Sequence, residues 1–205
     1  MFATDLVLSS PLKDLLPEAL LSACQSTAFS KGSRLFVTGQ KPQWMFFVLN
    51  GEVTLERLSE RGNPVVLQRT RHGFVSEASL QSAHYHCDAI AVTNADVVQI
   101  PLSALAHALA QDAEFGNRWI RMLNLEVKRL RLQCERLSMK SVKDRILHLL
   151  QTEGRNGVYE VNTGLKSLAG ELGVTHEALY RTLAMMEKER LIQRDEGQLR
   201  LITPI

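Results

Sequence analysis

The segment Leu165 to Ile192, LKSLAGELGVTHEALYRTLAMMEKERLI, decides the fold of the C-terminal part of the chain. Its first half predicts a short helix from Leu165 to about Leu172. Gly173 can adopt a positive φ at little cost, which ends that helix. Thr175 can then cap a second helix that runs from His176 to about Arg190. The segment therefore predicts two helices joined by a tight turn.

The predicted second helix has an apolar face and an open polar face. At 100° per residue, Leu179 and Leu183 point toward the first helix. The open face carries a carboxylate, a phenol, a guanidinium and a methyl group, from Glu177, Tyr180, Arg181 and Ala184. Arginine can bind guanine through two hydrogen bonds, and glutamate can accept one from cytosine N4. The pattern is typical of a helix-turn-helix whose second helix enters the DNA major groove. An ordinary helical hairpin with a solvated charged face is the alternative.

A short hairpin follows the second helix. Gln193–Arg194 and Leu199–Ile202 have the composition of strands, and Glu196–Gly197 between them is a turn signal. A hairpin directly after a recognition helix predicts a winged helix-turn-helix. Arg194 and Arg200 on this wing are candidates for contacts to DNA phosphates, and the alternative is that they are only solubilising charges.

The segment from about Ser26 to Ile100 has a different residue pattern, in which short β-prone runs alternate with glycines. Strands that recur at such short intervals predict an antiparallel sandwich or roll. Asn50–Gly51 is a hairpin signal between two of these strands. The predicted strands include residues 34–37, 45–49, 52–55, 65–67 and 95–100.

A long helix is predicted from about Asp112 to Leu137. Apolar residues recur in it at heptad spacing, which is typical of a two-stranded coiled coil and predicts a homodimer. The seam consists of Ile120, Leu123, Val127, Leu130, Cys134 and Leu137. A second apolar stripe, predicted to pack on the chain's own β-domain, consists of Phe115, Trp119, Met122 and Leu132. The alternative is that both stripes belong to the core of one chain.

These predictions combine into an α+β fold with three parts. Residues 1–110 form an antiparallel, jelly-roll-like β-roll with N-terminal helices that start near Ser10 and Pro11. Residues 111–138 form the dimerisation helix, and residues 139–205 form the winged helix-turn-helix domain. Met139–Lys140 is the expected hinge, and Ser141 caps the next helix.

Composition narrows the class of protein. A hydrophobic content of 45% and a charged content of 22% are ordinary for a globular protein. The chain has no apolar run of ~20 residues and no signal peptide, so we expect a cytoplasmic protein that does not enter a membrane. The net charge of +2 is small, but nine Lys or Arg stand against three Asp or Glu between Arg118 and Arg145. Such a local basic surface attracts phosphates.

The three cysteines, Cys24, Cys87 and Cys134, are widely spaced. Such spacing argues against a disulfide framework and against a four-cysteine cluster held by one chain. Cys134 lies in the predicted seam, where it is either a small apolar residue or the site of a disulfide between two chains.

The order of these elements resembles the CRP/FNR family of bacterial transcription factors, named after the cyclic-AMP receptor protein and the fumarate–nitrate regulator. The stretches that carry the resemblance are GQKPQWMFFVLNG from Gly39 to Gly51, SEASL from Ser76 to Leu80 and GVTHEALYR from Gly173 to Arg181. The resemblance implies a homodimer on double-stranded DNA with a two-fold symmetric operator, contact with RNA polymerase, and no enzymatic activity.

The resemblance also assigns residues in the second helix. Glu177 and Arg181 match the family's base-reading Glu and Arg, and Thr175 matches a residue that contacts phosphate. His176 departs from the family, in which Arg or Pro is common at this position, and it can contact a phosphate or a base. Tyr180 completes the predicted DNA-binding face.

The family's cyclic-AMP site is incomplete in this sequence. Ser76–Glu77 stands where nucleotide-binding members have Gly-Glu, so Glu77 is kept and the glycine is lost. The Arg-Ser/Thr pair of those members falls within residues 83–87, and no Lys or Arg occurs between His72 and Arg118. Because a buried phosphate without a cation is costly, we expect cyclic AMP not to bind tightly. The candidate effector residues are Ser76, Glu77, His84, Tyr85, His86 and Cys87.

Several alternatives stay open for this region. In a strand, His84 and His86 share one face and can bind a metal or haem, or they are simply strand residues beside a core that contains Tyr85 and Cys87. Redox sensing by the thiol in this segment is a further alternative. A cupin-like metal-dependent enzyme would add Glu77 as a ligand. A constitutive DNA-binding regulator with a vestigial sensor needs no effector at all. The cofactor is therefore unknown from the sequence.

Overall fold

The computed structural model describes residues 12–60, 62, 64–161 and 164–202 of the 205-residue chain, and the helix start expected at Ser10 and Pro11 lies outside them. The chain divides into two compact units, Met1–Arg121 and Met122–Ile205. The predicted domain boundaries after residues 110 and 138 stay predictions.

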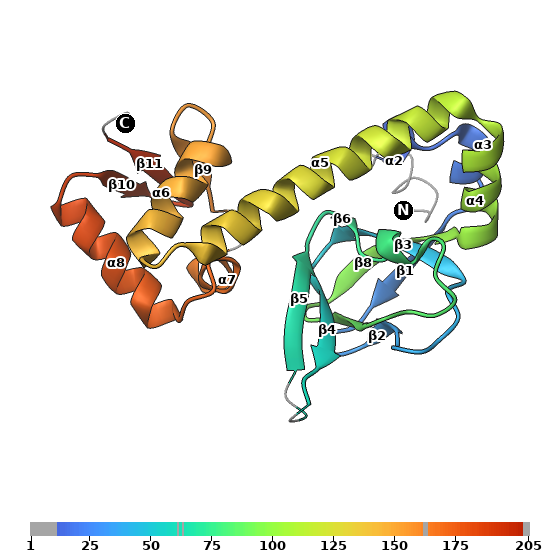
Figure 1. Ribbon diagram of the computed structural model, residues 1–205, viewed down its shortest axis with the longest axis horizontal. Coiled ribbons are helices and arrows are strands. Elements are labelled where there is room, and N and C mark those ends of the chain that lie inside the picture. The colour runs from blue at the N-terminus through green and yellow to red at the C-terminus, as the bar shows by residue number, and fades with distance from the viewer. Residues whose placement is uncertain (1–11, 61, 63, 162–163, 203–205) are drawn as a thin grey trace. The chain divides into compact units, whose positions relative to one another are not determined.

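The N-terminal unit contains two antiparallel four-stranded sheets (Figure 1). One sheet has the strand order β1-β8-β3-β6 and the other has β2-β7-β4-β5. Helices α2 (Leu12–Leu15) and α3 (Glu18–Leu21) precede the sheets. The strands are β1 (Gln25–Phe29), β2 (Arg34–Phe36), β3 (Trp44–Asn50), β4 (Val53–Leu58), β5 (Pro64–Thr70), β6 (Gly73–Phe74), β7 (Asp88–Ala91) and β8 (Ala95–Pro101). The predicted β-roll is confirmed.

Apolar side chains from both sheets make up the core of the roll. Val48 on β3, Val53 on β4 and Val97 on β8 have no exposed surface. Strand pairing is long-range, because β1 pairs with β8 from Gln25 opposite Gln99 to Phe29 opposite Ala95. β3 is buried continuously from Met45 to Leu49, whereas β7 alternates between buried and half-buried residues.

The predicted hairpin at Asn50–Gly51 is wrong. β3 and β4 flank this turn but lie in different sheets, so the turn carries the chain from one sheet to the other. Gly51 has φ +82°, and a Cβ atom there would lie 2.2 Å from the Asn94 carbonyl oxygen. The glycine therefore marks a close approach of two backbone segments as well as a turn.

Two helices follow the roll, α4 (Leu102–Gln111) and α5 (Ala113–Ser138). The Asp112 carboxylate accepts a hydrogen bond from the Phe115 N–H at 2.9 Å, which separates the two helices by capping the second. Phe115 and Trp119 are buried, and the Trp119 ring meets the edge of Phe74 of β6 at 5.1 Å. Packing of Trp119 on the β-domain is confirmed, and Phe115 is buried against Trp119. The same prediction for Met122 and Leu132 stays open, because both belong to the other unit.

The C-terminal unit is a winged helix-turn-helix. After α5 come α6 (Val142–Thr152), β9 (Val158–Glu160), α7 (Leu165–Glu171), α8 (His176–Lys188), β10 (Ile192–Asp195) and β11 (Gln198–Leu201). The three strands form one antiparallel sheet in the order β10-β11-β9. The predicted cap of α6 is confirmed, since the Ser141 hydroxyl accepts a hydrogen bond from the Asp144 N–H at 3.0 Å. Ile146, Leu172 and Met186 lie in the shared core.

Candidate nucleic-acid interface

The turn between α7 and α8 has the predicted chemistry. Gly173 has φ +65°, and the Val174 N–H donates to the Ala169 carbonyl at 3.0 Å. The Thr175 hydroxyl accepts a hydrogen bond from the Ala178 N–H at 3.2 Å and so caps α8. The Val174–Ala169 backbone hydrogen bond and the Thr175 side-chain cap together fix the direction in which α8 leaves the turn.

The two faces of α8 differ sharply in exposure. Leu179 and Leu183 have no exposed surface. The exposed side chains lie on the opposite face, at His176, Glu177, Tyr180, Arg181 and Ala184. The pKa of Glu177 lies below its ordinary value because its carboxylate accepts hydrogen bonds from its own backbone N–H and from the Thr175 hydroxyl. Glu177 is therefore an ionised acceptor at neutral pH, next to the exposed guanidinium of Arg181.

The two wing arginines differ in surroundings. Arg200 on β11 is exposed and lies opposite Gln193 in the ladder, on the outer face of the hairpin. Arg194 on β10 is half-buried and forms a two-point ion pair with Glu187 of α8, with nitrogen–oxygen distances of 2.8 and 3.3 Å. Its guanidinium also lies 5.9 Å from the centre of the Tyr180 ring. Sequence reasoning missed this pairing, although opposite charges flank the turn between α8 and β10.

The predicted dimer seam on α5 is largely open in the single chain. Ile120 is 56% exposed and Val127 is 45% exposed. Leu130, Cys134 and Leu137 are also exposed, and Leu123 is half-buried. These residues therefore remain available to a partner.

The cysteines have different surroundings. Burial raises the pKa of Cys24 to about 11, and burial also raises the pKa of Cys87. Cys134 is exposed on α5. Of the three thiols, that of Cys134 is therefore the most open to solvent.

The candidate effector residues do not converge on one open site. The Ser76 hydroxyl accepts from the Phe46 N–H at 3.2 Å and contacts the sulfur of Met45, so it serves β3. Glu77 begins a short 3₁₀ helix, Glu77–Ser79. The strand expected for residues 84–87 is wrong, because the next strand begins only at Asp88. Backbone bonds between Tyr85 and the Gly39–Gln40 loop hold this segment apart from the sheet ladders.

Tyr85 and Cys87 are buried, whereas His84 and His86 are exposed. The Tyr85 hydroxyl donates to the Trp44 carbonyl at 2.8 Å, and its ring stacks on Phe36 at 3.9 Å. In the described parts of the chain, no three metal-binding side chains gather into one group. These contacts favour the interpretation in which Tyr85 and Cys87 are core residues.

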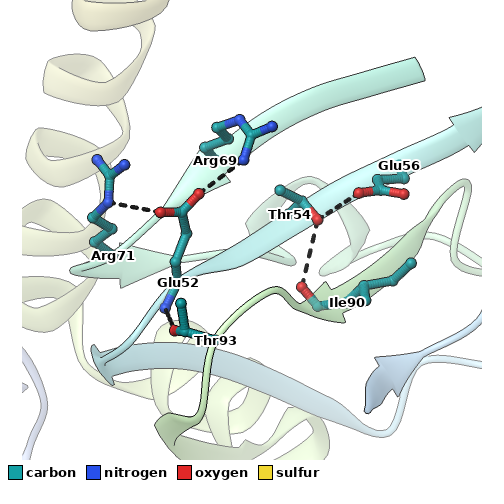
Figure 2. Close-up of polar contacts among 7 residues, drawn as sticks. All are labelled: Glu52, Thr54, Glu56, Arg69, Arg71, Ile90 and Thr93. Atoms are coloured by element: carbon teal, nitrogen blue, oxygen red, sulfur yellow. Dashed lines mark hydrogen bonds and ion pairs between the residues drawn. The ribbon is translucent and has the colours of Figure 1, made fainter. Parts of the chain in front are cut away.

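Two arginines of the β-domain directly precede, in the sequence, the stretch between His72 and Arg118 that lacks Lys and Arg. Arg69 and Arg71 both form ion pairs with Glu52, at 2.8 and 3.0 Å (Figure 2). The Glu52 N–H in turn donates to the Thr93 hydroxyl at 2.8 Å. The Glu52 carboxylate therefore holds both guanidinium groups, and its backbone N–H ties the residue before β4 to the turn that precedes β8.

Comparison with known proteins agrees with this architecture. A model of the cyclic nucleotide-binding domain matches residues 26–112. The global nitrogen regulator of Synechococcus elongatus is 20% identical over 193 residues, which are 88% of this chain and 87% of that protein. A crystal structure from Ruegeria pomeroyi DSS-3, provisionally described as a cyclic nucleotide binding protein, is 26% identical with a TM-score of 0.62 and covers 98% of this chain and 92% of its own. A transcriptional regulator of the CRP family from Thermus thermophilus has a TM-score of 0.56 at 20% identity, over 86% of this chain and 92% of its own. The chain therefore contains a region that matches the cyclic nucleotide-binding domain, and it resembles a global nitrogen regulator and a CRP-family regulator over most of its length.

Two of these relatives are described as regulators, and the chain shares the order of a β-roll and a C-terminal helix-turn-helix with the CRP-family structure. Among the residues that the structure describes, no helix has both the length and the apolar character that a membrane crossing requires.

Proposed function

We propose that the protein is a homodimeric, sequence-specific DNA-binding transcription regulator whose β-roll responds to a signal other than cyclic AMP. The observation that carries the proposal is the exposed face of α8, where an ionised Glu177 and a guanidinium at Arg181 stand beside each other on a rigid, capped helix. Glu accepts from cytosine N4 and Arg donates to guanine O6 and N7, so the two side chains together read a C·G-containing half-site.

The remaining contacts follow from their positions around this pair. Thr175 and His176 stand at the N-terminus of α8, where phosphates are favoured by the helix dipole and free N–H groups. Arg200 on the outer face of the wing is the proposed phosphate contact of the hairpin. Arg194 is the weaker candidate for a phosphate contact, because Glu187 already holds its guanidinium.

The dimer forms through the exposed seam of α5. Val127 and Leu130 at its centre are exposed in the single chain, and burial against the same residues of a second copy would remove them from water. A parallel pair of α5 helices relates two recognition helices by a two-fold axis. The operator is accordingly a two-fold symmetric sequence with half-sites one helical turn apart. Contact with RNA polymerase is part of the same proposal, by analogy with the family.

Cyclic AMP is a poor ligand for this β-roll. The position of the family's phosphate-binding Arg falls in the loop around Tyr85, whose hydroxyl is already bonded to Trp44. The upstream guanidinium groups already have partners, because Arg69 and Arg71 bind Glu52 and the Arg57 Nε–H donates to the His86 carbonyl at 3.3 Å. Titration calorimetry with cyclic AMP is expected to show no binding at micromolar concentrations, and a micromolar dissociation constant would contradict the proposal.

The decisive experiment is selection of bound duplexes from a random DNA pool with the full-length chain. We expect a palindromic consensus. The variants Glu177→Ala and Arg181→Ala should each relax the preference at one base pair of each half-site and weaken binding by about 1–3 kcal/mol. Lys188→Ala, an exposed residue at the far end of the same helix, is the matched control and should leave the consensus unchanged. An unchanged consensus for the Glu177 and Arg181 variants would overturn the assignment.

A further inference from the structure

The exposed face of α8 contains an aromatic pair that the Glu177–Arg181 assignment does not use. The rings of His176 and Tyr180 meet edge to face with their centres 4.4 Å apart. Residues four apart lie on the same side of a helix, so this contact is built into α8 itself. Tyr180 is 42% exposed, so part of its ring surface is accessible to a partner molecule.

The wing fixes the position of Tyr180. Ile192 and Arg194 point to the same side of β10, and Ile192 is buried in the core of the unit, so that side faces α8. The Arg194 guanidinium lies 5.9 Å from the centre of the Tyr180 ring, within the usual range of a cation–π contact. Tyr180 therefore touches its own helix on one side and the wing on another.

Glu187 holds Arg194 in this place. The Glu187 carboxylate accepts hydrogen bonds from both the Nε and an Nη of the guanidinium. These two bonds fix the orientation of the guanidinium plane as well as its distance from Glu187. Glu187 lies seven residues after Tyr180, on the same side of α8, and Ala184 between them contributes only a methyl group. The guanidinium thus has room to lie along the helix from Glu187 toward the ring.

We infer that Arg194 is a positioning residue for base recognition, and that the base feature recognised by the Tyr180 ring, which packs against His176, is the 5-methyl group of a thymine. The inference rests on the proposed DNA-binding function. Polar base edges are matched by Glu177 and Arg181, whereas an aromatic ring surface matches the one apolar group in the major groove. Arg194 already has a carboxylate partner and therefore contributes little to phosphate binding.

The test uses the operator obtained from the random pool and replaces each thymine in turn by uracil, which lacks only the 5-methyl group. For the wild-type chain, one thymine per half-site is expected to show a loss of about fourfold, the value of one buried methyl group. Tyr180→Ala should abolish this loss, and Tyr180→Phe should keep it. Arg194→Ala should reduce the loss in the same way as Tyr180→Ala, and the double variant should add nothing further.

Arg200→Ala is the matched control on the same hairpin. It should leave the uracil penalty intact and reduce the slope of log K against log salt by about 0.9 for each phosphate that is no longer neutralised, whereas Arg194→Ala should leave that slope unchanged. Glu187→Gln keeps Arg194 but weakens its anchor, and should lower the uracil penalty without removing it. Far-UV circular dichroism and thermal unfolding establish that each variant is folded.

The outcomes separate the inference from the proposed function. If the wild type selects no duplex at all, the proposed function fails. If the wild type selects an operator but tolerates uracil at every position, or if Arg194→Ala keeps the penalty and lowers the salt slope instead, only the inference is overturned.

Discussion

The Arg145 guanidinium of α6 donates a hydrogen bond of 2.7 Å to the Leu172 carbonyl at the end of α7. A second nitrogen of the same side chain donates to the Met139 carbonyl at 3.0 Å. Met139 follows the long helix, and Leu172 is the C-cap of α7, directly before the turn to α8. One side chain therefore joins the expected hinge to the helix-turn-helix.

Replacement of Arg145 by Met should remove these bonds while keeping most of the side-chain volume. Because carbonyls at a hinge and a helix end would lose charged donors, we expect the free energy of unfolding to fall by about 2 kcal/mol and operator affinity to fall with it. Urea unfolding and DNA titration measure the two effects. Arg155→Met, at an exposed arginine of the same unit, should change stability by less than about 0.5 kcal/mol. Equal effects of the two substitutions would contradict the role of Arg145.

The heptad seam of α5 predicts that Val127 contributes to the dimer interface and that Leu125 does not. Val127→Glu places a carboxylate in the seam of both chains and should raise the dimer dissociation constant about 100-fold or more, since two valines lose their burial. Leu125 is more exposed, at 66%, but lies outside the heptad positions, so Leu125→Glu should leave the dimer intact. Sedimentation equilibrium distinguishes the two. A monomeric wild type would refute the dimer.

The close backbone approach at Gly51 predicts that an alanine there costs much more stability than an alanine at Gly39. Gly51→Ala should destabilise the β-roll by about 3 kcal/mol, because the new methyl group meets backbone at 2.2 Å and the positive φ disfavours any side chain. Gly39 has a similar φ of +85°, but a methyl group added there would meet nothing within 4 Å, so Gly39→Ala should cost only about 1 kcal/mol. Thermal unfolding of both variants compares the two losses of stability. A larger loss for Gly39→Ala than for Gly51→Ala would contradict the close approach at Gly51.

Asp88 predicts a pH dependence for the roll. The Thr38 N–H lowers the pKa of Asp88 below its ordinary 3.8, the Thr38 hydroxyl and Arg34 act in the same direction, and partial burial opposes them. A lowered folded-state pKa gives stability that is present above pH 3.8 and is lost as the pH falls through the folded-state value. Asp88→Asn should therefore cost about 0.5 kcal/mol at pH 7, after allowance for solvent screening. The difference from wild type should shrink below about pH 4 in urea unfolding. A difference that grows on acidification would be inconsistent with this account.

The sequence predicts those elements whose signals are local. Thr175 and Ser141 cap their helices as expected, and Gly173 takes the positive φ that the turn requires, because each effect involves only residues within four positions. The same applies to the open face of α8, which follows from helical periodicity alone.

The sequence does not predict features that depend on how distant segments meet. Asn50–Gly51 has the composition of a hairpin, and nothing local reveals that β3 and β4 join different sheets. The burial of residues 84–87 alternates as in a strand, although the segment is held by the Gly39–Gln40 loop. The Glu187–Arg194 pair depends on the direction of the wing, which is fixed only when Ile192 enters the core.

The pairing of β1 with β8 has a consequence for biosynthesis. Gln25 finds its ladder partner only at Gln99, so the first strand to leave the ribosome must wait until nearly half of the chain has been made. The helix-turn-helix, by contrast, closes over a few tens of residues and can fold as soon as it emerges. Nascent chains truncated before residue 95 should therefore expose unpaired strand edges and recruit chaperones.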